Sequence, residues 1–130
     1  MEKTININEH KITSSDRNVK ENIRLVKSDV ADKTKGIPFY SFNYKDDINK
    51  HKVYGVIAQE VEDSNLGELI YDKGDGTLAV DYTSLFCLKL SSHDNFLSYV
   101  LGKCLKLEKE VKELKEENKS ILEKINDKKD

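Results

Sequence analysis

Several residue types are scarce in this sequence, and each scarcity excludes a class of protein. The 130 residues include no Trp, one Pro, one Met and only two Cys, Cys87 and Cys104. Two cysteines cannot build the disulfide framework of a small secreted domain, so we expect a reducing, cytoplasmic compartment. The chain also has no His and Cys cluster with zinc-site spacing. We therefore predict no metal and no other cofactor.

An excess of one charge and long apolar runs are lacking too. Lys and Arg number 22 against 24 Asp and Glu, so the net charge is −2. This balance gives no basic footprint for nucleic acid. No apolar run approaches the roughly 20 residues that span a bilayer, and the N-terminus lacks the apolar core of a signal peptide. We expect neither a nucleic-acid nor a membrane partner.

Charged residues are abundant, and they gather at the C-terminal end. They make up 35% of the chain, and residues 103–130 alone contain nine Lys and eight Asp or Glu. This distribution predicts a globular body followed by a charged C-terminal extension, a helix at 96–130.

The C-terminal helix has a heptad pattern. Its apolar positions follow a strict 3-4 spacing, which predicts a parallel coiled coil. The predicted seam comprises Leu97, Val100, Cys104, Leu107, Val111, Leu114, Asn118, Ile121 and Ile125. One amphipathic helix packed on its own body is the alternative, and the heptads leave dimer and trimer open. The helix begins as early as Tyr82, or else the run Ser91–Asp94 divides it into two helices.

The sequence of the body predicts an α+β fold with few, short helices and strands. Alternating or apolar runs predict strands at 4–8, 39–44, 53–58, 69–71 and 78–80. A helix is expected at 59–62, and a short helix or turn at 16–26. Residues 46–50 form a polar loop, and Asp72–Gly76 a turn rather than a calcium loop, because it lacks the closing Glu.

Three blocks of the sequence resemble one family. They are Ser15-Asp16-Arg17-Asn18-Val19-Lys20-Glu21-Asn22-Ile23, Gly55-Val56-Ile57-Ala58-Gln59-Glu60-Val61 and Val80-Asp81-Tyr82-Thr83-Ser84-Leu85. In this order they resemble the intramolecular chaperone auto-processing domain. That domain ends endosialidase-type phage tailspikes and occurs in the myelin regulatory factor. The resemblance implies a homotrimer that helps a phage or viral client to fold.

The resemblance also implies self-cleavage, in a single turnover in cis, by a serine endopeptidase. Ser15 matches the nucleophile and Lys20 its activating base, so the scissile bond would be Ser14–Ser15. The resemblance thus implies a short N-terminal segment (1–14) ahead of an auto-processing body (15–95). Asp16 and Asn22 also match positions of the family's signature and imply orienting roles.

Gln59 and Glu60 match the second block, which assigns them no catalytic task. Asn18 departs from the pattern, because the family has Arg there, and Gly67 stands where it has Pro.

The chemistry of such a dyad sets two physical conditions. A lysine that accepts a proton must be neutral, whereas free lysine titrates near 10.4, so burial on assembly must favour the neutral form. Residues five apart lie about 140° apart on a helix and on opposite faces of a strand. We therefore predict a turn near Arg17-Asn18 that brings Ser15 and Lys20 together.

The position of the first block leaves a second function open. Cleavage at Ser14–Ser15 would release residues 1–14, a peptide too short to be a folded client. The alternative to a self-cleaving chaperone is a non-cleaving trimeric oligomerisation or adaptor protein with the same fold. The resemblance and the Lys-, Asn- and Ile-rich composition favour a phage or viral source.

Overall fold

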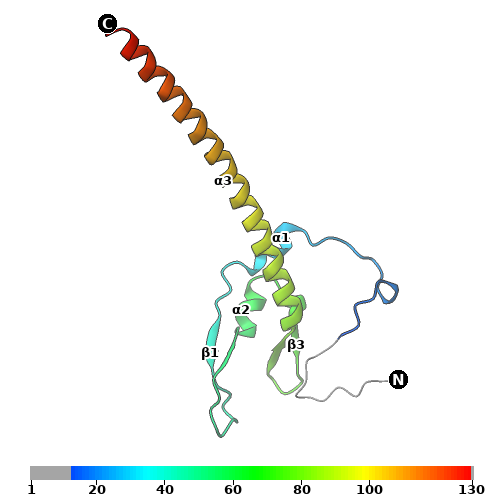
Figure 1. Cartoon of the computed structure of the whole chain (residues 1–130). Helices are drawn as coiled ribbons and strands as arrows, with labels where there is room; N and C mark the ends of the chain where they lie inside the picture. Colours follow the sequence, from blue (N-terminus) through cyan, green and yellow to red (C-terminus); the bar gives the residue numbers. More distant parts are fainter. Residues whose placement is uncertain (1–12, 130) are drawn as a thin grey trace.

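The computed structural model describes residues 13–129, so the strand predicted at 4–8 lies outside the described part. Figure 1 shows a small body from which one long helix projects. The elements in chain order are η1 (Arg17–Val19), α1 (Ser28–Ala31), η2 (Asp32–Thr34), β1 (Tyr40–Phe42), β2 (Val53–Gly55), α2 (Ala58–Asp63), η3 (Gly67–Leu69), β3 (Ile70–Asp72), β4 (Leu78–Val80) and α3 (Tyr82–Asp127). The predicted α+β class and long C-terminal helix are confirmed.

The body contains two separate antiparallel hairpins. Strand β1 pairs with β2, with Tyr40 opposite Gly55, and β3 pairs with β4, with Ile70 opposite Val80. The strand predicted at 53–58 is too long, because β2 ends at Gly55. The next backbone N–H, that of Val56, donates to the Tyr82 hydroxyl at 3.2 Å instead of continuing a ladder.

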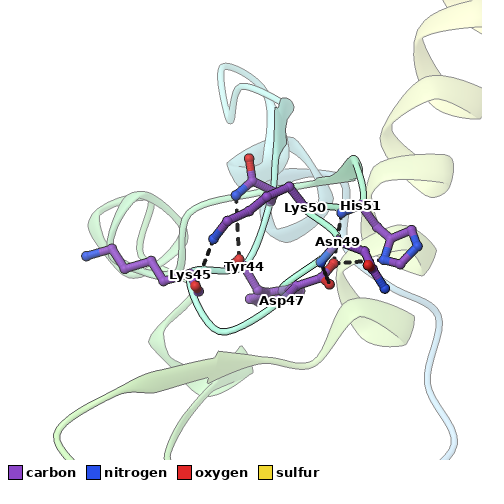
Figure 2. A network of polar contacts seen from close by, with 7 residues as sticks. Tyr44, Lys45, Asp47, Asn49, Lys50 and His51 are labelled. Carbon is purple, nitrogen blue, oxygen red and sulfur yellow. Dashed lines mark hydrogen bonds and ion pairs between the residues drawn. The ribbon is translucent and has the colours of Figure 1, made fainter.

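The loop between β1 and β2 is held by Asp47 (Figure 2). One carboxylate oxygen accepts the backbone N–H of Asn49 at 3.0 Å. The other accepts the backbone N–H of His51 at 2.8 Å and lies 2.9 Å from its ring Nδ1. These bonds, first the one from the His51 backbone, lower the pKa of Asp47. The predicted polar loop is thus an ordered turn.

The β3–β4 turn follows from its Asp and Gly residues. Asp72 accepts the N–H of Gly74 at 2.7 Å, and Asp75 accepts that of Thr77 at 2.9 Å. Gly74 and Gly76 have φ values of 82° and 83°, a region that glycine enters without steric cost. The turn prediction is confirmed.

Helix α3 runs unbroken through Ser91–Asp94, which decides against two helices. Asp81 caps its start by accepting the Ser84 N–H at 3.0 Å. Ser92 is buried, and its hydroxyl donates to Asp32 of η2 at 2.8 Å. Lys89 donates to the carbonyl of Thr34 at 3.0 Å. Packing against η2 therefore uses Ser92, one of the polar residues that suggested a break.

The core is one small cluster beneath the first turns of α3. It consists of Ile37, Val56, Val61, Leu66, Leu69 and Leu85. Each fully buried leucine contributes on the order of 1.5–3 kcal/mol, so this cluster supports a small body and little more. From Ser92 to its end at Asp127, α3 has no further buried residue. Within residues 13–129, no helix is long and apolar enough to cross a membrane.

Candidate functional site

Ser15 and Lys20 lie on the two sides of one short turn. The 3-10 helix η1 occupies Arg17–Val19, and the backbone is extended at Lys20. This reversal brings the Lys20 Nζ to 2.7 Å from the Ser15 Oγ, to which it donates a hydrogen bond. The turn lies where the five-residue spacing requires it. Of the short helix or turn expected at 16–26, only this turn forms.

Asp16 fixes the turn. Its carboxylate accepts the backbone N–H of Asn18 at 2.7 Å, and its carbonyl accepts that of Val19 at 3.2 Å. This is an N-cap, the role for which Asp is among the best residues. The donor at position 18 is the backbone, so the Asn that replaces the family's Arg leaves the turn intact.

Asn22 follows the dyad at a bend. Its φ is 52°, in the left-handed region that Asn and Asp enter more easily than other non-glycine residues. The match of Asn22 to the family's signature therefore has a backbone explanation. The bend directs the chain after Lys20 towards α1.

The dyad lies on an uncovered segment. We call residues 13–27 the arm; it extends from α1 on the side of α3 away from β1 (Figure 1). Every residue of the arm is exposed, Ser14, Ser15 and Lys20 included. Residues 13–129 thus supply the proximity of the two groups, but not the burial that a neutral lysine requires.

Gln59 and Glu60 lie elsewhere, on α2 in the body. Gln59 lines a cavity of about 380 Å³ between the two hairpins. Glu60 accepts a hydrogen bond from the Tyr40 hydroxyl at 2.9 Å, which raises the pKa of that tyrosine. Its second carboxylate oxygen is buried and has no hydrogen-bond partner among the described residues. Helix α2, which carries both residues, lies apart from the arm that carries the dyad (Figure 1).

A contact that the sequence did not predict joins the second and third blocks. A Cβ added at Gly55 would stand against the hydroxyl and ring of Tyr82. Gly55 therefore permits the Tyr82 hydroxyl to reach the Val56 N–H. In the sequence, the only indication of this contact was a glycine in the second block and a tyrosine in the third.

The predicted seam lies on α3 and is uncovered in the single chain. Val100 is half-buried, and the other eight seam residues are exposed. The coiled coil and its number of chains stay predictions. Among residues 13–129, no group of three His, Cys, Asp or Glu side chains is placed to hold a metal ion.

Comparison with known families supports the first two blocks. Residues 15–70 match the family model described as chaperone of endosialidase. The resemblance inferred from the sequence is thereby confirmed over this range, which supports a chaperone-like domain. The third block, at 80–85, lies beyond the matched residues. The search of curated proteins found no match to this chain.

Proposed function

We propose that this chain is a trimerising, chaperone-like module that cuts its own Ser14–Ser15 bond once it has assembled. The observation that carries the proposal is the 2.7 Å contact between the Lys20 Nζ and the Ser15 Oγ. A nucleophile and its base must lie within hydrogen-bond reach, and this pair does. The family match over residues 15–70 supports the chaperone part.

The proposed reaction needs no group beyond this chain and water. Neutral Lys20 accepts the proton of the Ser15 hydroxyl while Oγ attacks the Ser14 carbonyl carbon. The peptide C–N bond breaks, Lys20 returns the proton to the Ser15 nitrogen, and an ester joins Ser14 to the Ser15 side chain. Water then hydrolyses that ester, leaving the Ser14 carboxylate and the Ser15 hydroxyl. Proximity within one chain supplies much of the rate.

Assembly supplies the remaining condition. Because the arm is exposed in the single chain, the dyad is solvated until other copies cover it. Cleavage would then report that the module has assembled around a tailspike-type client of phage or viral origin. The exposed, free thiols of Cys87 and Cys104 fit a reducing compartment such as the cytoplasm.

Intact-mass measurement of purified chains tests the proposal. The wild-type chain should lose residues 1–14, whereas Ser15→Ala should stay whole. Lys20→Arg should also stay whole, because arginine keeps the donor and the charge but does not act as a base at neutral pH. Ser14→Ala keeps the nucleophile and is the matched control, so it should be cleaved.

The non-cleaving adaptor is the second candidate, and the uncovered seam favours it equally. Eight exposed seam positions on α3 are a surface for association whether or not the dyad reacts. If the wild-type chain assembles and yet keeps its full mass, the cleavage proposal is wrong and the adaptor function stands.

A further inference from the structure

The arm carries apolar side chains that are exposed in the described part of the chain. Val19 is 67% exposed, Ile23 is 55% exposed and Leu25 is 97% exposed. The hydrogen bonds at the dyad, from Asn18 to Asp16 and from Lys20 to Ser15, are internal to the arm. Exposed apolar residues gathered on one segment mark a surface that binds a partner.

The body has a cavity of mixed polar and apolar lining that can receive such a segment. It lies between the two hairpins, holds about 380 Å³, and is lined by Phe42, Ile57, Leu78, Val80 and Tyr82 among others. Gln59 and Lys73 are polar members of the lining, and Tyr44 and Tyr82 also carry hydroxyl groups. A concave site that combines apolar side chains with a few polar groups is the usual form of a binding site.

Charge favours the arm as the occupant. The arm has four basic residues and two acidic ones. Helix α2, which borders the cavity through Ala58 and Gln59, carries three acidic residues and no basic one, whereas the charged residue within the cavity lining is Lys73. The buried Glu60 oxygen on α2 adds an acceptor that has no donor among the described residues. Opposite charges on two surfaces steer their association and fix its orientation.

The position of the arm points to a second copy rather than to its own cavity. The arm leaves α1 on the side of α3 away from β1 and runs down towards the level of the hairpins (Figure 1). Parallel association along α3 would place the bodies of neighbouring copies at that same level. The arm of one chain then faces the body of the next.

We propose that the arm of each copy docks on the body of a neighbouring copy, with its apolar residues in the cavity between the hairpins and its basic residues along α2. The inference rests on the self-association proposed above, and it does not require cleavage. In this arrangement a neighbouring chain buries the Ser15–Lys20 dyad, which is exposed in the single chain. Gln59 and Glu60 would then border a dyad from which they are apart in a single chain.

Photo-cross-linking of the full chain tests this docking. A benzophenone amino acid replaces Leu25 in a Ser15→Ala background; this side chain is 97% exposed, so the fold tolerates the change. Unlabelled and nitrogen-15-labelled chains are unfolded together, refolded and irradiated. The cross-linked peptides are identified by mass spectrometry, and the oligomeric state is measured on the same sample. The same probe at Ile48, 93% exposed on the β1–β2 loop, is the matched control.

The expected product joins position 25 to peptides containing residues 56–59 or 78–82, with mixed-isotope pairs as frequent as same-isotope pairs. The Ile48 probe should not give these products, and Arg24→Glu should reduce their yield several-fold. Cross-links confined to same-isotope pairs, or directed elsewhere, in an oligomeric sample would overturn the docking and leave self-association intact. A monomeric sample would overturn both.

Discussion

The arm and the body differ in what fixes their side chains. In the body, Leu85 and Ser92 are each 1% exposed and are held by contacts between distant parts of the chain. In the arm, every residue is exposed, and a single capped turn sets the geometry of Ser15 and Lys20. Reacting groups can therefore be positioned by local backbone structure alone. The burial that favours a neutral lysine comes from packing, and the described residues provide none around the arm.

The body should lose most stability when its core is opened. Leu85→Ala removes a fully buried side chain from the only core cluster seen in residues 13–129. We expect a loss of roughly 2–5 kcal/mol in the free energy of unfolding, because the cavity left behind cannot fully close. Urea denaturation followed by circular dichroism measures it. Ile48→Ala, on an exposed side chain, should change stability by less than about 0.5 kcal/mol. Equal losses in the two variants would contradict the assigned core.

The contact between the second and third blocks should give the next largest effect. Gly55→Ala places a methyl group against the Tyr82 hydroxyl. Overpacking of this kind costs roughly 1–3 kcal/mol. Gly67→Ala is the control, because a Cβ there meets nothing within 4 Å. Thermal unfolding of both variants checks the difference, and a Gly55→Ala chain as stable as the control would disprove the close approach.

A smaller effect, dependent on pH, is expected at Asp32. The hydrogen bond from Ser92, and then the one from Lys35, lower the pKa of Asp32 below its usual 3.8. A lowered pKa stabilises the fold above pH 3.8, and this contribution is lost as the pH falls through the folded-state value. Ser92→Ala should therefore be less stable than wild type at neutral pH, and the gap should narrow in acid. A gap that widened in acid would contradict this sign.

A substitution in the arm should change the rate of cleavage without changing the stability of the body. Asn22→Val puts a β-branched residue at φ 52°, and the left-handed region costs such residues roughly 1–2 kcal/mol. If the dyad cleaves, the rate should fall about tenfold, since 1.36 kcal/mol corresponds to a factor of ten. Asn22→Gly should retain the rate. Both are measured by the time course of the intact mass, and equal rates would show that the bend does not position the dyad.

Local signals in the sequence predicted much of this structure. The Asp and Gly residues of 72–76 specified the second hairpin, and the heptad period specified α3. The five-residue spacing required the turn that Asp16 caps. Element ends were less predictable, because β2 stops where Tyr82, 26 residues away, takes the Val56 N–H. No pattern in the sequence predicted α1 and η2, because they are too short for their apolar residues to repeat at a helical period. They are held instead by tertiary contacts such as the bond between Ser92 and Asp32, which are 60 residues apart.

The same limit applies to the site. Ser15 and Lys20 are neighbours through local structure, and they could be found from the resemblance together with the spacing. The bond between Glu60 and Tyr40 joins residues 20 apart through tertiary packing, and no sequence pattern marked it. No part of the described chain covers the arm. A sequence read as one chain therefore defines the dyad, but not its surroundings.

Native mass spectrometry of the wild-type chain beside Leu107→Asp and Lys109→Asp tests most directly the claim that assembly makes the dyad reactive. Leu107 is a predicted seam position, and Lys109 lies on the outer face of the same helix, so only the first change should prevent association. We expect oligomers of chains that lack residues 1–14 for wild type and Lys109→Asp, and whole monomers for Leu107→Asp. A Leu107→Asp monomer that is cleaved, or an assembled wild-type chain that stays whole, would show that assembly does not control cleavage.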